Sequence, residues 1–357
     1  MPEDEQRRGA EPDDAALLQR ICSAYIKAAE DEESVSPTYR ATAWWERIRQ
    51  HNLKPVIHAL LNRHLDALRR MYGNFFRDPC SAGLIGMPWS GALFGDASQD
   101  VYRRFYLSDA LHRIDYWKAQ TEGRFELSEL AGPESGNPFG VLIDGTLIRL
   151  GSEYHHYCAQ RIIDFLGDSL TALPNPARAT VAEIGGGFGD MAYYLLRDQP
   201  RIAYLDFDLP ETIALASYYL LKSFPERRFL LYGEGEIAAD TDVVLMPAFK
   251  LVALPAASAD VAFCSHLLSD ISPQAAAEYL EAIARITRDR FLFVGSGNAA
   301  EQAFDLLRRG DHRFVLAATR RSEWHKHRAP RWDEVECVYR AVSQSDAQIE
   351  PAGMRES

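Results

Sequence analysis

Apolar residues recur every three or four positions along much of the first 150 residues, and this spacing predicts amphipathic helices. One apolar face begins at Leu18 and a second at Ile57. Residues 1–14 are charged and lack this periodicity, so we expect a disordered tail there. The pattern therefore predicts a mostly helical N-terminal domain over residues 15–150.

A β-hairpin is expected at the end of this domain. In GVLIDGTLIRLG two short apolar runs flank Asp144-Gly145, a dipeptide that accepts positive φ angles. The following stretch, SEYHHYCAQRIIDFLGDSL, again has helical periodicity.

From Ala179 onward, short apolar runs alternate with helical stretches, which predicts a doubly wound parallel sheet. Strands are expected at Thr180–Ile184, Ile202–Phe207, Val243–Met246, Val261–Cys264 and Phe291–Val294. Helices are expected at Asp190–Arg197, Pro210–Ser223, Pro273–Thr287 and Ala300–Arg309. FVLAAT and VECVYRAV predict a terminal strand pair, whereas FLLY is a strand candidate without an assigned place. The second domain is predicted over residues 151–345, followed by a C-terminal tail at 346–357.

Composition narrows the classes of function. The net charge of -12 argues against a nucleic-acid partner, which usually needs a basic surface. The five cysteines form no Cys-x-x-Cys pair, which favours reduced thiols over disulfides or a zinc site. No signal peptide or membrane-length apolar segment is evident, so we expect a soluble cytoplasmic protein without a membrane partner.

The stretch VAEIGGGFGDMAYYLL carries the main binding motif, a strand, a glycine-rich turn and a helix. Gly185, Gly187 and Gly189 allow a ligand to approach the backbone closely. The turn also fits the dinucleotide pattern G-x-G-x-x-A. Glu183 favours S-adenosylmethionine (SAM) instead, because a carboxylate repels a pyrophosphate and suits a cationic amino-acid group.

A second carboxylate follows at the end of the next predicted strand. Asp208 lies 19 residues past Gly189, where a ribose diol would be bound. Asp208 and Glu211 also fit a helix capping box, and Asp206 is the second candidate for the ribose.

Candidate catalytic residues follow the fourth strand, in FCSHLLSDIS. Ser265 and His266 are expected beside the methyl donor, with His266 as the base and Asp270 as its orienting partner. A histidine that only caps or packs in this loop is the alternative interpretation.

Further histidines are candidates for binding substrate or a metal. Tyr154, His155 and His156 are expected to line the substrate cavity, although at most one of two successive histidines on a helix should face it. His325-x-His327 has metal-ligand spacing but lies in a charged loop, so no metal is assigned.

Taken together, these motifs resemble the sugar O-methyltransferase family within the class I SAM-dependent superfamily. The resemblance rests on AWWERIRQHN, YGNFFR, NPFGVLIDGTLIR, EIGGGFGDMAYYL, LDFDLPETIALASYYL, FCSHLLSDIS and FLFVGSGN. It implies a Rossmann-like seven-stranded methyltransferase sheet behind a mostly helical N-terminal domain. The segment after the third strand also resembles that of class I enzymes, which places Ala248 and Phe249 beside the adenine, although core packing explains Phe249 equally well.

The sequence thus predicts an O-methyltransferase that uses SAM and releases S-adenosylhomocysteine (SAH). The expected acceptor is a hydroxyl of a small polar molecule, such as a sugar or a sugar-bearing natural product. N-methylation of an amino sugar or amino acid derivative is the nearest alternative, and a nicotinamide oxidoreductase a more distant one. A catalytically silent SAM-binding partner protein and a homodimer also stay open.

Overall fold

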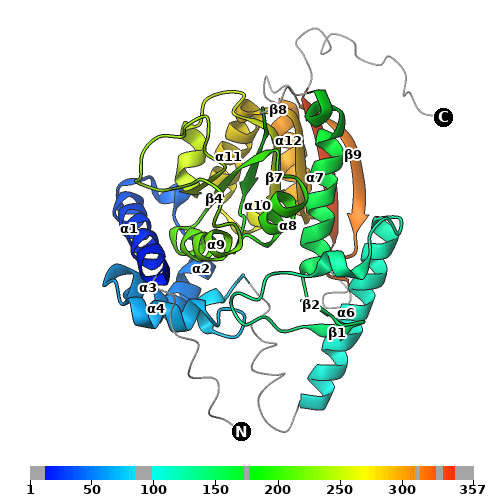
Figure 1. Cartoon of the computed structure of the whole chain (residues 1–357). Helices are drawn as coiled ribbons and strands as arrows, with labels where there is room; N and C mark the ends of the chain where they lie inside the picture. The colour runs from blue at the N-terminus through cyan, green and yellow to red at the C-terminus, as the bar shows by residue number, and fades with distance from the viewer. Residues whose placement is uncertain (1–12, 85–98, 173–176, 310–313, 327–332, 342–357) are drawn as a thin grey trace, which may run out of the picture.

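The computed structural model describes residues 13–84, 99–172, 177–309, 314–326 and 333–341. The first half is mostly helical, as predicted (Figure 1). Its helices are α1 (Asp13–Ser34), α2 (Ala43–Ile48), α3 (Lys54–Leu61), α4 (Leu65–Tyr72) and α6 (Gln99–Gln120). Single helical turns lie at η1 (Pro37–Tyr39), η2 (Arg49–Leu53), η3 (Pro79–Ser81) and η4 (Leu127–Leu130). The tails predicted at residues 1–14 and 346–357 lie almost entirely outside the described residues.

The predicted hairpin is confirmed. Strands β1 (Val141–Ile143) and β2 (Thr146–Ile148) pair in antiparallel register. Asp144 and Gly145 join them with φ angles of 50° and 82°. Two successive positive φ angles define the tight hairpin turn that this dipeptide favours.

The second half alternates strands and helices. Its strands are β3 (Ala179–Ile184), β4 (Ile202–Asp208), β5 (Phe229–Leu231), β6 (Val243–Pro247), β7 (Ala259–Ser265), β8 (Thr287–Ser296), β9 (Phe314–Ser322) and β10 (Glu334–Ala341). Its helices are α7 (Ser152–Ala172), α8 (Asp190–Asp198), α9 (Pro210–Ser223), α10 (Leu267–Asp270), α11 (Pro273–Ile286) and α12 (Gly297–Arg309), with the turn η5 (Ala248–Ala253). Every strand and helix predicted from Ala179 onward is present, with small shifts at the ends.

The strands form one sheet in the order β5-β6-β4-β3-β7-β8-β10-β9. The first six of these are parallel, while β10 is antiparallel to both of its neighbours. The predicted α/β fold is confirmed, but the expected count of seven strands is wrong. FLL pairs with the edge of β6 and adds an eighth strand. This place in the sheet is decided by backbone hydrogen bonds to a distant segment, and a run of three apolar residues does not predict them.

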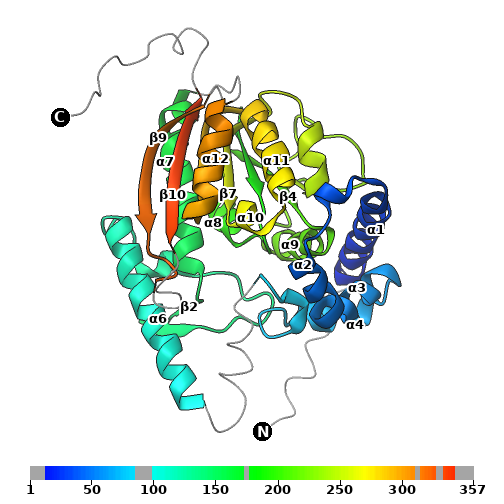
Figure 2. The same cartoon turned by 180° about the vertical axis from the view of Figure 1, so that it is seen from behind.

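Helices cover both faces of the sheet, as the opposite views in Figures 1 and 2 show. Successive strand residues point to opposite faces. Val181 accordingly belongs to the core beneath α7, α8 and α9, whereas Ala182 belongs to the core beneath α11 and α12. The first core also includes Leu18 of α1 and Leu60 of α3, so the N-terminal helices share it. The domain boundary expected at residue 150 stays a prediction.

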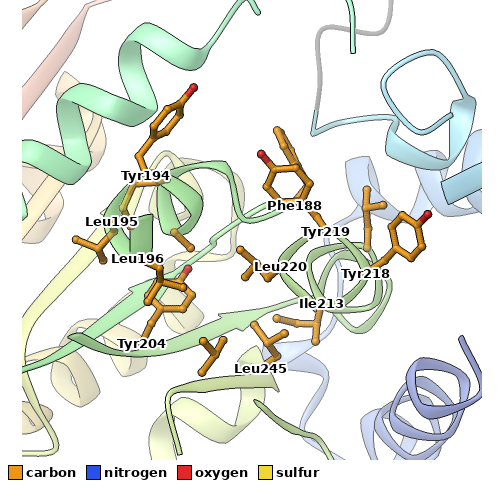
Figure 3. Close-up of a cluster of buried hydrophobic side chains, with 14 of the residues drawn as sticks. Phe188, Tyr194, Leu195, Leu196, Tyr204, Ile213, Tyr218, Tyr219, Leu220 and Leu245 are labelled. Carbon is orange, nitrogen blue, oxygen red and sulfur yellow. The ribbon is translucent and has the colours of Figure 1, made fainter. Parts of the chain in front are cut away.

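Figure 3 shows the part of this core that supports the glycine turn. Leu195 of α8 and Leu220 of α9 lie over Tyr204 and Leu245 of the sheet, and all four side chains are buried. These contacts fix the two helices that begin beside the ends of β3 and β4.

Among the described residues, none of the helices has the length and apolar character that a membrane-spanning segment needs.

Replacing Leu195 by alanine should lower the free energy of unfolding by about 2–5 kcal/mol, because it removes buried methyl groups and leaves a cavity. Leu142→Ala is the matched control, since Leu142 is 72% exposed and Leu195 is 0% exposed. Urea unfolding of the two variants and the wild type measures the difference. Equal destabilisation by both substitutions would contradict this account of the core.

Candidate functional site

A cleft lies at the carboxyl ends of β3, β4, β6 and β7. This is where the strand order reverses, because β3 pairs with β4 on one side and with β7 on the other. Doubly wound sheets bind their ligands at such a point. The lining residues from the sheet side are Glu183, Gly185, Gly186, Gly187, Phe188, Asp190, Asp208, Leu209, Ala248, Phe263, Ser265, His266, Leu267, Ile271, Ala275 and Tyr279.

The N-terminal segment forms the opposite wall of this cleft, which the sequence reasoning did not anticipate. Its contribution includes Tyr39 and Trp45, and the ring of Tyr39 stacks on Tyr279 at a centroid distance of 5.7 Å. Arg49 links the segment to α9, because its Nε donates to Oε1 of the buried Glu211 at 2.7 Å. The cleft is thus built from both halves of the chain.

The glycine turn brings backbone atoms against the cleft. Gly187 has a φ of 60°, and its N–H donates to Oδ2 of Asp208 at 2.9 Å. Gly186 allows the closest approach, because a Cβ there would lie 2.4 Å from Oδ1 of Asp206. Sequence reasoning singled out Gly185, Gly187 and Gly189 but missed Gly186, whose requirement arises only from its neighbour on β4.

Three carboxylates lie buried beneath this turn. Glu183, Asp206 and Asp208 are only 3%, 0% and 6% exposed, and Glu183 is directly opposite Asp206 in the sheet. Tyr204 donates its hydroxyl to Oε2 of Glu183 at 2.5 Å, and Leu209 N–H donates to Oδ1 of Asp208 at 2.6 Å. Among the described residues, no ion pair involves any of the three carboxylates.

Burial disfavours the charged forms of these groups and raises their pKa values. The pKa of Glu183 rises to about 8, because burial and the charge of Asp208 outweigh the hydrogen bond from Tyr204. The pKa of Asp208 rises to about 7 through burial, although backbone N–H groups of Leu209 and Gly187 oppose the rise. Burial, Glu183 and Asp208 all raise the pKa of Asp206. The site therefore concentrates negative charge that protons or a cation must offset.

A second buried cluster surrounds Asp190, the first residue of α8. Arg149 donates to its Oδ1 at 2.6 Å, Tyr219 donates to the same oxygen at 3.0 Å, and His155 Nδ1 lies 2.9 Å from Oδ2. Burial raises the pKa of Asp190, but the charges and hydrogen bonds of Arg149 and His155 lower it by a larger amount. The pKa of Asp190 therefore lies below its usual value. Sequence reasoning identified His155 but not Asp190 or Arg149. This cluster fixes His155 at the edge of the cleft.

Polar side chains gather at the end of β7. The hydroxyl of Tyr154 lies 2.7 Å from Oγ of Ser265, and His266 follows in a left-handed conformation with φ of 62°. The N–H of His266 donates to the carbonyl of Val294 at 2.8 Å, which holds this strained backbone in place. Ser265 and His266 both line the cleft, and the roles expected for them stay predictions.

His266 belongs to a cluster that was not predicted. Its Nε2 lies 3.4 Å from Oε2 of Glu334, and Nδ1 of His325 lies 2.7 Å from the same oxygen. Ser322 donates its hydroxyl to the other oxygen, Oε1. Burial raises the pKa of Glu334, yet the hydrogen bond from His325 and the nearby rings lower it overall. Glu334 opens β10, and no local sequence signal connects it to His266.

Besides Tyr154, three predicted site residues lie outside the cleft lining. His156 is fully buried and accepts the indole N–H of Trp117 at 3.1 Å, so it lies in the core and not in the cleft. Phe249 packs edge-on against Tyr232, as its alternative interpretation expected. Gly189 precedes α8 with a φ of 90°, outside the cleft lining. The side chain of Asp270 and the whole of His327 lie outside the described residues.

The ribose alternatives also separate in the structure. Asp208 lines the cleft, whereas Asp206 is fully buried beneath Gly186. The capping box is not formed, because the residue that caps α9 is Leu209. Of these two candidates, only Asp208 therefore lines the cleft.

No protein-family model matches the chain. No curated protein matches it either. Among solved structures, magnesium protoporphyrin IX methyltransferase (ChlM) from Synechocystis PCC 6803 with bound SAM is similar at 12% identity over 70% of this chain and 99% of that chain, with a TM-score of 0.35. The small RNA methyltransferase HEN1 is similar at 12% identity over 57% of this chain and 26% of that chain, with a TM-score of 0.38. The pyocyanin biosynthetic protein PhzM is similar at 14% identity over 54% of this chain and 59% of that chain, with a TM-score of 0.32. Likenesses this distant assign no activity, so function must be argued from the site.

The buried carboxylates predict how stability depends on pH. Glu183 and Asp208 titrate at about 8 and about 7 in the folded protein, but near 4.5 and 3.8 when unperturbed. Their contribution to the free energy of unfolding is fully present below the unfolded pKa values, and it is lost as pH rises through 7 and 8. Each pKa unit corresponds to about 1.4 kcal/mol. Without ligand, the protein should unfold at lower urea concentration at pH 8.5 than at pH 6.

Glu183→Gln should flatten this pH dependence, because glutamine cannot ionise. Glu226→Gln is the matched control, since Glu226 is exposed at the other end of the sheet. If Glu183→Gln and wild type lose the same free energy between the two pH values, the assignment of the raised pKa to Glu183 is wrong.

Proposed function

We propose that the cleft binds SAM and that the protein is a SAM-dependent methyltransferase. The observation that carries this proposal is the set of buried carboxylates at the glycine turn, Glu183, Asp206 and Asp208, which form no ion pair among the described residues. A ligand with an ammonium and a sulfonium group offsets their charge. A dinucleotide would instead bring a negatively charged pyrophosphate against them.

The lining residues fit SAM along the length of the cleft. Glu183 suits the amino-acid end, and Asp208 suits the ribose, because its two carboxylate oxygens can accept further hydrogen bonds besides those from the backbone. Ala248 at the end of β6 and Tyr279 of α11 offer apolar surface for the adenine. SAM, when bound, supplies a methyl group on a positively charged sulfur.

Oxygen is the atom that we propose to be methylated. Ser265 and His266 line the cleft at the end of β7, and the hydroxyl of Tyr154 lies 2.7 Å from Oγ of Ser265, so hydrogen-bonding groups that suit a hydroxyl gather there. His266 is proposed to take the proton of that hydroxyl, which makes the oxygen a better nucleophile. The proposed acceptor is a small polar molecule, such as a sugar or a sugar-bearing natural product, and the aromatic wall formed by Trp45 and Phe188 offers it a packing surface.

Cofactor binding tests the first part of this proposal. The full chain should bind SAH and show no thermal shift with NAD. Glu183→Gln should weaken SAH binding by about 1.5–3 kcal/mol, which is the typical value of a hydrogen bond to a charged group. This corresponds to a roughly ten- to hundredfold higher Kd by calorimetry. Glu226→Gln should bind SAH like the wild type, and stabilisation by NAD in place of SAH would overturn the proposal.

Turnover tests the second part. SAH release should be followed with a panel of sugars, amino sugars and phenols as acceptors. His266→Ala should lower turnover by about 10²–10⁴-fold, which is the usual contribution of a general base, while SAH binding is retained. His51→Ala, at an exposed histidine outside the cleft, is the control.

The outcomes separate the remaining alternatives. Turnover confined to amine acceptors would favour N-methylation. Unchanged turnover in His266→Ala would contradict the role given to this histidine. SAH binding without turnover on any acceptor would favour a silent SAM-binding partner protein.

A further inference from the structure

Three side chains with metal-binding atoms converge beside the acceptor end of the cleft. His266 follows β7, His325 follows β9 and Glu334 begins β10, and one ligand atom of each lies within 4.8 Å of the others. His266 and His325 are partly buried and Glu334 is buried. The topology of the sheet therefore gathers them, because β7, β8, β10 and β9 are successive neighbours.

The composition of this cluster is that of a metal site with open positions. Two histidines and one carboxylate bind Zn²⁺ in catalytic sites, where a fourth position is left for water or substrate. Ligand atoms about 2.0–2.1 Å from a tetrahedral ion lie roughly 3.3 Å from each other. The 3.4 Å between Nε2 of His266 and Oε2 of Glu334 matches this spacing. The 2.7 Å between His325 and Glu334 is shorter, so binding requires these two side chains to separate by a fraction of an ångström.

Surrounding groups orient the candidate ligands, as they do in established metal sites. Ser322 donates its hydroxyl to Oε1 of Glu334, which leaves Oε2 directed at both histidines. The backbone N–H of His266 is fixed by Val294, and the buried ring of Trp324 lies beside Tyr154 at a centroid distance of 5.6 Å. These contacts hold Glu334 and the backbone of His266 in place beside the aromatic rings of Tyr154 and Trp324.

We propose that His266, His325 and Glu334 together bind one divalent transition-metal ion of the Zn²⁺ class, and that this ion holds an oxygen atom of the acceptor. The proposal rests on the proposed methyltransferase function for the identity of the acceptor, but not for the metal site itself. Because His266 lines the cleft, open positions of the ion would be within reach of an acceptor there.

A bound ion changes what His266 does. With an ion bound, Nε2 of His266 would be a metal ligand, so the role of base proposed above for this ring would apply only to the protein without the ion. The positive charge would instead lower the pKa of a hydroxyl bound to the ion. Its proton would pass to solvent water, and its oxygen would take the methyl group as SAH leaves. With three protein ligands, an ion of this class has one or two positions left, which favours an acceptor with adjacent oxygen atoms, such as a vicinal diol.

Co²⁺ is the probe for this site, since its visible absorption reports the ligand set directly. The chain is dialysed against a chelator and titrated with Co²⁺, and then Zn²⁺ is added in competition. We expect one equivalent of Co²⁺ to bind to the wild type, with an absorption band that Zn²⁺ removes. His325→Ala and Glu334→Gln should each weaken binding about tenfold or more, whereas the exposed-surface control His51→Ala should bind like the wild type.

SAH binding is measured in every variant as the test of folding and of the proposed function. Retained SAH binding with weakened Co²⁺ binding supports the metal site. Absence of stoichiometric Co²⁺ binding to the wild type, or equal binding in wild type and His325→Ala, would overturn the proposal and leave the methyltransferase proposal intact. If Glu334→Gln fails to bind SAH, this buried substitution has disturbed the fold. The Co²⁺ affinity of His325→Ala, which changes a partly exposed side chain, then tests the metal site. If the wild type binds Co²⁺ but does not bind SAH, the proposed function is refuted and the metal site stands.

Discussion

Glu183, Asp206 and Asp208 place three carboxylates together at the ends of β3 and β4, where they are shielded from water. Buried charge of one sign is costly unless protons, hydrogen bonds or a counter-charge offset it. Tyr204 and the backbone N–H groups of the glycine turn supply part of this compensation. The proposed binding of SAM would offset the remaining charge with a cationic ligand. The turn needs glycine at residue 186 for a steric reason, because a Cβ there would lie 2.4 Å from Oδ1 of Asp206.

The N-terminal helices complete this site from the other side. They share the hydrophobic core under α9, and Arg49 joins Glu32 and Glu211 in a partly buried ion-pair network. Tyr39 and Trp45 thereby form a wall of the cleft opposite the sheet. The helical first half is therefore a structural part of the ligand site, in addition to any role it has in stability.

The acceptor end of the cleft depends on contacts between segments that are distant in the chain. His266 extends from β7 in a left-handed conformation, and Glu334 meets it only because β10 returns antiparallel beside β8. A carboxylate between two imidazoles can orient a proton acceptor or complete a metal site. Both roles place the chemistry at the same edge of the sheet, next to Ser265 and Tyr154.

The sequence by itself determined the features that are local. Apolar runs and their spacing located the parallel strands and the helices between them, Asp144-Gly145 located the hairpin, and the motif around Glu183 located the glycine turn. These signals are readable because each element is specified by residues a few positions apart. Ser265 and His266 were found for the same reason, since they directly follow a predicted strand.

Tertiary structure alone decided the rest. It brought Glu334 to His266, Arg149 to Asp190 and the N-terminal wall to the sheet. It also turned His156 into the core, and it paired a three-residue run at the edge of β6 as an eighth strand. Contacts of this kind depend on packing and on pairing between segments that are far apart in the chain. Periodicity and short motifs are local, so they do not predict these contacts.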